Sequence, residues 1–120
     1  MTDITTAGYT NLNIGPFIAN NWGFIEFQTS AGIKLIRISK SDPRVTTTVL
    51  DSKHVSYSIV LHGYDSDITT KGLPLTFGQT VFKLTDSDVA VPMAIQTFSN
   101  ATLVLPNDTL TTTISIGILN

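Results

Sequence analysis

The chain has 120 residues, a net charge of −2 and only 13% charged residues, against 42% hydrophobic ones. This length fits one domain with a substantial hydrophobic core. Weak negative charge and scattered lysines and arginines exclude the basic surface that nucleic-acid binding normally needs. No apolar run approaches the ~20 residues that cross a bilayer, and residues 1–10 lack the apolar core of a signal peptide. The chain has no cysteine, which excludes disulfides and favours a bacterial or viral origin.

Neutral polar residues must cover most of the surface, because charged residues are so few. Threonine is the most frequent residue, and serine and asparagine are also common. Neutral hydroxyl groups cost far less to desolvate than charges. This surface chemistry suits a domain that lies against other proteins, and it also suits an ordinary secreted β-domain.

Strand signals follow one another along the chain, whereas no stretch of a dozen residues has the helical spacing of apolar residues. Residues 1–13 are polar and predict an extended N-terminal arm. A hairpin is expected next, because two β-rich runs flank a glycine-containing turn at residues 30–32. No helix longer than about two turns is expected. Ten runs carry strand signals, and we expect eight or nine short strands among them: 17–19, 23–29, 33–39, 44–50, 54–62, 73–77, 79–84, 93–98, 101–105 and 109–119.

The clearest alternation of apolar and polar residues lies in the run 54–62. Successive side chains of a strand point to opposite faces, so alternate positions share a face. The face predicted to be buried contains Val55, Tyr57, Ile59 and Leu61.

Short strands separated by turn signals every 8–12 residues are typical of a β-sandwich or barrel. Uneven strand lengths and prolines at several strand ends favour the sandwich. We therefore predict an all-β fold: a single antiparallel β-sandwich over residues 14–120, immunoglobulin-like in topology, with the arm formed by residues 1–13.

Two similar tetrapeptides, Asp65-Ser66-Asp67-Ile68 and Asp86-Ser87-Asp88-Val89, contain the best candidates for metal ligands. Alternating aspartates can direct two carboxylates at one calcium ion, but the further ligands and the glycine of a calcium loop are missing. Aspartate and serine also satisfy their own backbone in turns. We therefore predict turns and no metal site.

The sequence contains no catalytic motif. The nucleophile elbow, the phosphate-binding loop and the dinucleotide fingerprint are all absent. His54 and His62 lie eight residues apart on one predicted strand, roughly 26 Å, so they cannot share a metal ion. We expect no enzyme activity, no catalytic residues and no cofactor.

Aromatic residues leave a second function open. Tyr9, Trp22 and Tyr64 are candidates for an exposed platform on which a sugar could stack, as in carbohydrate-binding or adhesive sandwiches. The alternative for Trp22 is a place over the core beside Phe24 or Phe27. The directions of Trp22 and Tyr64 distinguish these two interpretations.

The C-terminal half contains a recognisable series of short motifs. In chain order these are Leu61-His62-Gly63, Asp65-Ser66-Asp67-Ile68, Leu73-Pro74-Leu75 and, before an apolar strand, Asp108-Thr109-Leu110-Thr111-Thr112. This half of the chain resembles the small immunoglobulin-like accessory proteins of tailed bacteriophage particles, such as head-decoration (cement) proteins and short fibres. The resemblance implies a virion location, contact with the major capsid protein, homo-oligomers that are often trimers, and no catalysis. It supplies no motif from which functional residues could be transferred.

The predicted arm suggests a route to assembly. Its isolated apolar residues are Ile4, Tyr9 and Leu12. So polar a segment cannot by itself offset an ordering entropy of about 1–2 kcal/mol per residue. We expect these three residues to dock on a neighbouring subunit, as an arm that links symmetric copies; a frayed terminus without a partner is the alternative.

Overall fold

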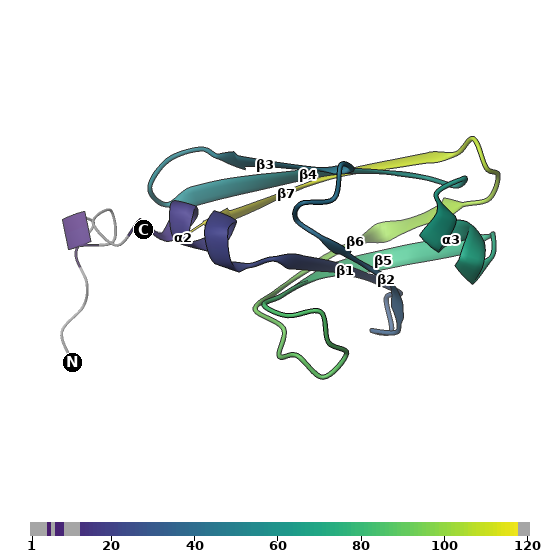
Figure 1. The fold of residues 1–120 in the computed structure, drawn as a ribbon, viewed down its shortest axis with the longest axis horizontal. Helices are drawn as coiled ribbons and strands as arrows, with labels where there is room; N and C mark the ends of the chain where they lie inside the picture. Colours follow the sequence, from purple (N-terminus) through teal and green to yellow (C-terminus); the bar gives the residue numbers. More distant parts are fainter. Residues whose placement is uncertain (1–4, 6, 9–12, 118–120) are drawn as a thin grey trace.

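The computed structural model describes residues 5, 7, 8 and 13–117. The predicted assembly-arm residues Ile4, Tyr9 and Leu12 lie outside the described residues. Two antiparallel sheets face each other, with one short helix near each end of the sandwich (Figure 1). The elements are α2 (Ile14–Asn21), β1 (Phe24–Gln28), β2 (Lys34–Ser39), β3 (Val45–Val49), β4 (His54–His62), α3 (Ser66–Lys71), β5 (Leu75–Lys83), β6 (Ala94–Leu103) and β7 (Thr109–Gly117).

The four-stranded sheet has the order β2-β1-β5-β6, and the three-stranded sheet has the order β3-β4-β7. This confirms a mostly β, sandwich-like fold, but the immunoglobulin-like topology is not confirmed. In the constant immunoglobulin domain the second and fifth strands form the central pair of the four-stranded sheet, whereas here the first and fifth strands do. Alternation along a strand reveals its buried face and carries no information about which strand lies beside it.

Two pairs of predicted strands are each one continuous strand. Runs 73–77 and 79–84 form β5, and runs 93–98 and 101–105 form β6. The register explains the apparent breaks, because Phe77 pairs with Ala101 but Gln79 pairs with Thr97. β6 therefore contains two extra residues opposite Gly78, which makes a bulge and not a turn.

The predicted strand at residues 17–19 is wrong, because these residues belong to α2. Ile14 and Ile18 lie one helical turn apart and pack on the core. Gly15 lets the helix approach the turn between β3 and β4, where its N–H donates to the Ser52 carbonyl at 3.0 Å. A Cβ at position 15 would lie 2.6 Å from the Asp51 carbonyl oxygen. The polar segment 63–72, which carries no strand signal, likewise contains α3, which buries Ile68.

The predicted buried face of β4 is confirmed. Val55, Tyr57, Ile59 and Leu61 are all fully buried between the sheets. They face a layer from the four-stranded sheet that includes Ile25, Phe27, Phe77 and Phe82. Tyr57 packs against Phe82 with a ring separation of 4.9 Å. Burial raises the pKa of Tyr57 to about 12, and its hydroxyl donates to the Ile18 carbonyl at 3.3 Å.

Candidate functional site

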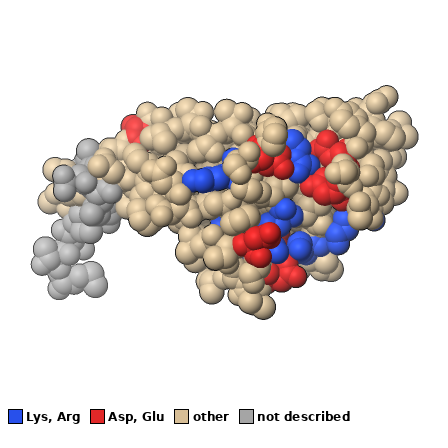
Figure 2. All heavy atoms as spheres, in the orientation of Figure 1, with Lys and Arg blue, Asp and Glu red and all other residues tan. Residues whose placement is uncertain are grey.

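Most charged side chains belong to two networks. Most blue and red residues gather on one part of the visible face, with few charged residues elsewhere on it (Figure 2). The Arg37 network lies on the outer side of the four-stranded sheet and contains Glu26, Lys34, Arg37, Lys83, Asp86 and Asp88. The Arg44 network lies beside α3 and contains Asp42, Arg44, Asp65 and Asp67.

The Arg37 network has a buried centre. The side chains of Glu26, Arg37 and Lys83 are only 3%, 7% and 5% exposed. Strand register brings them together, because Glu26 on β1 lies directly opposite Arg37 on β2 and Lys83 is on the adjacent strand β5. Glu26 Oε1 accepts hydrogen bonds from Arg37 Nη1 at 2.6 Å and from Lys83 Nζ at 3.1 Å.

The Glu26 carboxylate is held in its charged form. Burial pushes the pKa of Glu26 upward, but hydrogen bonds from Gln28, Arg37 and Lys83 outweigh burial and leave it below its ordinary value. A buried carboxylate with two cationic partners is strongly stabilised in its ionised form. The centre is therefore a buried ion triad in which Glu26 is ionised near neutral pH.

The Arg37 network fastens loop 84–93, the connection between β5 and β6, onto the sheet (Figure 1, green). Asp86 Oδ1 accepts from Arg37 Nε at 2.8 Å, and Asp88 Oδ1 accepts from Arg37 Nη1 at 2.8 Å and Lys34 Nζ at 3.1 Å. Lys83 Nζ donates to the loop carbonyls of Ser87 and Asp88. Hydrogen bonds from Arg37 and Lys34 lower the pKa of Asp88 to about 2.

The fastened loop presents apolar side chains to solvent. Val89 is 90% exposed and Val91 is 69% exposed. Leu84, Met93 and the neighbouring Ile95 of β6 are also exposed. We call the set Leu84, Val89, Val91, Met93 and Ile95 the apolar loop surface. These five residues lie close together in the sequence, between residues 84 and 95, and clusters of exposed apolar residues often mark a contact site for another protein.

The other Asp-Ser-Asp motif, Asp65-Ser66-Asp67, likewise binds an arginine side chain, that of Arg44. Arg44 Nη2 donates to Asp42 Oδ2 at 2.8 Å and to Asp67 Oδ2 at 2.9 Å, and Arg44 Nη1 donates to Asp65 Oδ2 at 3.2 Å. Each Asp-Ser-Asp motif thus binds an arginine from β2 or the start of β3. Among residues 5, 7, 8 and 13–117, no group of three or more histidines or carboxylates has metal-site geometry.

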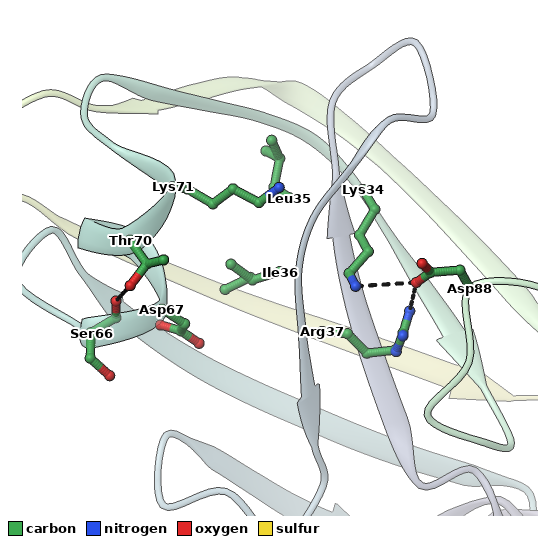
Figure 3. A pocket seen from close by; sticks show the side chains of 9 residues that line it. All are labelled: Lys34, Leu35, Ile36, Arg37, Ser66, Asp67, Thr70, Lys71 and Asp88. Atoms are coloured by element: carbon green, nitrogen blue, oxygen red, sulfur yellow. Dashed lines mark hydrogen bonds and ion pairs between the residues drawn. The ribbon is translucent and has the colours of Figure 1, made fainter.

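A hollow of about 540 Å³ lies between β2 and α3 (Figure 3). Its charged groups are largely occupied, because Asp88 binds Lys34 and Arg37 while Asp67 binds Arg44. The hollow therefore offers few unpaired charged groups to a ligand. Its lining consists of Lys34, Leu35, Ile36, Arg37, Ser66, Asp67, Thr70, Lys71 and Asp88.

The structure does not bring the candidate sugar-platform residues Trp22 and Tyr64 together. Trp22 follows α2 and packs beside Phe82, with a ring separation of 6.3 Å. Tyr64 lies two residues after the C-terminal end of β4 and is exposed, with its ring stacked on His62. The nine residues of β4 span ~26 Å, so Trp22 and Tyr64 lie at opposite ends of the sandwich. Tyr9 lies outside the described residues.

The two histidines also stay apart. His54 begins β4 and His62 ends it. Nδ1 of His54 lies 2.8 Å from Asp51 Oδ1, and His62 stacks on Tyr64. Each histidine has a local partner at its own end of the sandwich.

No known protein family, curated protein or solved structure matches the chain. Within the described part of the chain, neither helix is long and apolar enough to span a bilayer.

Sequence reasoning missed the apolar loop surface. The available signal was the pair Val89 and Val91, which directly follows an Asp-Ser-Asp motif in a turn.

Proposed function

We propose that the chain is a non-enzymatic structural protein of a bacteriophage virion: a capsid decoration (cement) protein that stabilises the head by binding the major capsid protein. The observation that carries this proposal is the apolar loop surface. Val89 and Val91 project into solvent from a loop that ion pairs hold in one place. Contact residues that are fixed before binding lose little conformational entropy on docking.

The electrostatics of the chain support binding by neutral contacts. Opposite charges pair within the chain in both networks, and the other exposed residues include many threonines and serines, such as Thr97, Thr111 and Thr113, together with exposed apolar residues. Such a surface loses little free energy when water is removed from it. Apolar anchors within a polar rim are typical of protein–protein interfaces, and here the rim includes the exposed, paired carboxylates of Asp86 and Asp88.

The decisive experiment is a particle-binding assay. Purified chain is mixed with phage heads from its source that lack it, and co-sedimentation measures binding. The double variant Val89→Lys, Val91→Lys should lose most binding, because each lysine places a charge in an apolar contact.

The matched control changes exposed apolar residues elsewhere. Val104 and Leu105 lie between β6 and β7 and are also exposed. The double variant Val104→Lys, Leu105→Lys should bind as the wild type does. The proposal fails if the wild-type chain does not bind heads, or if both double variants bind equally well. Mass spectrometry of purified particles supplies the independent check, since a cement protein must be present in many copies.

A further inference from the structure

Among the described residues, β7 is an edge strand, and its outer edge is unusually open to pairing. β7 pairs with β4 in one uninterrupted register from Thr109 to Gly117, without a bulge, a proline or a charge. Proteins normally protect exposed strand edges with charged residues, prolines, bulges or short strands. A long, regular and neutral edge without such protection indicates a strand that another strand covers.

The other three edges carry the usual protection. β2 contains Lys34 and Arg37 and begins with a register irregularity against β1. β6 has its two-residue bulge. β3 is only five residues long and follows Pro43. Pairing in the described part of the chain is therefore favoured at β7.

The hydrogen bonds show which groups of β7 are free. The N–H of Gly63 donates to the Asp108 carbonyl, so Gly63 and Asp108 form a hydrogen-bonded pair of the β4–β7 ladder. Such pairs alternate along an antiparallel ladder. The even-numbered residues of β7 therefore bond to β4, and the odd-numbered residues direct their N–H and C=O groups outward. Those odd-numbered residues are Thr109, Thr111, Thr113, Ser115 and Gly117.

We propose that β7 pairs with β7 of a second copy of this chain, antiparallel and about a two-fold axis at Thr113. Thr113 is the central residue of the strand, so each free odd-numbered residue meets a free odd-numbered residue. Thr113 faces Thr113 of the second copy, and Thr111 faces its Ser115. Five such pairs form about ten backbone hydrogen bonds. Because β7 carries no charge, self-pairing places no like charges opposite each other.

The same register closes an apolar groove. A groove of about 220 Å³ lies between β6 and β7, lined by apolar residues that include Phe82, Ile95, Ile114 and Ile116. In the proposed pair, Leu110 of the second copy lies opposite Ile116, and Thr112 of the second copy lies opposite Ile114. Leu110 and Ile116 are only partly buried in one chain, so pairing removes further apolar surface from water. The product is a two-fold dimer with a six-stranded sheet. This proposal does not depend on the proposed function, and it predicts a dimer rather than a trimer.

Cysteine cross-linking tests the register directly, because the chain has no cysteine of its own. Hydrogen-bonded antiparallel pairs have a Cα separation of ~5.5 Å, within the ~4.4–6.8 Å that a disulfide spans. Thr113→Cys should therefore give a covalent dimer under mild oxidation. Thr48→Cys is the matched control, since Thr48 is also exposed but lies on β3. Equal cross-linking of the two variants would overturn the proposal.

Sedimentation of untagged full-length chain gives the second readout. The wild type should sediment as a dimer. Thr113→Lys and Thr113→Asp should each sediment as monomers, because each places like charges together at the two-fold axis. An equimolar mixture of the two variants should recover the dimer. A monomeric or trimeric wild type, or a mixture that stays monomeric, would contradict pairing at Thr113.

Discussion

Glu26 should be the charged residue whose loss costs most stability. The substitution Glu26→Gln keeps the shape of the side chain but removes the negative charge between Arg37 and Lys83. All three side chains are at most 7% exposed, so water cannot replace the missing charge. Breaking a buried ion pair by removing one partner typically costs ~3–5 kcal/mol. We expect the free energy of unfolding to fall by that amount.

Urea denaturation followed by Trp22 fluorescence measures this loss, with Asp86→Asn as the matched control. Asp86 contacts the same Arg37, but its side chain is 68% exposed, so its loss should cost below ~1 kcal/mol. A second control replaces the whole triad by Glu26→Leu, Arg37→Met and Lys83→Met, which should restore stability to near the wild-type value because no buried charge remains unpaired. The reasoning is refuted if Glu26→Gln costs no more than Asp86→Asn.

Three further predictions concern the core and the loop. Ile59 is fully buried, so Ile59→Ala should lower the free energy of unfolding by ~2–5 kcal/mol; a loss under ~0.5 kcal/mol would exclude it from the core. Among the described residues Thr80 Oγ1 is the buried side-chain polar atom without a hydrogen bond, so Thr80→Val should raise the denaturation midpoint, by a gain of ~1 kcal/mol. The pKa of Asp88 is about 2 in the folded chain against an ordinary 3.8, so its stabilising effect is present above the ordinary pKa and is lost as pH falls toward about 2. The difference in melting temperature between wild type and Asp88→Asn should therefore shrink on acidification, and a constant difference would contradict the ion pairs drawn for Asp88.

The sequence predicted β4 well because its signal is local. The apolar residues Val55, Tyr57, Ile59 and Leu61 occupy every second position, and a buried face needs only that period to be recognised. α2 was missed for the opposite reason, because eight residues give too little periodicity to identify a helix. Its contacts, such as the hydrogen bond from Gly15 to Ser52, join residues far apart in the chain.

The two arginine networks could not be predicted from local sequence patterns, because each joins residues that lie far apart in the chain. Arg37 lies 49 residues from Asp86 and 51 from Asp88, and Lys83 lies 57 residues from Glu26. Only the pairing of β1 with both β2 and β5 brings them together. The resemblance between the two Asp-Ser-Asp motifs was visible in the sequence, but their shared role required the positions of Arg37 and Arg44.

The residues substituted in the two tests lie on different sheets, so the effects of the two contacts can be separated, although Ile95 of β6 belongs to the apolar loop surface and also lines the groove beside β7. Loop 84–93 is fastened to the four-stranded sheet, whereas the β7 edge belongs to the three-stranded sheet. A dimer formed through β7 carries two copies of the apolar loop surface. If both reach the same capsid, the second contact forms at a high effective concentration and raises the overall affinity without any new kind of contact. Thr113→Lys would then weaken particle binding while leaving each loop intact. Val89→Lys, Val91→Lys would abolish particle binding and leave the dimer unchanged, so the two variants distinguish a failure of docking from a failure of self-association.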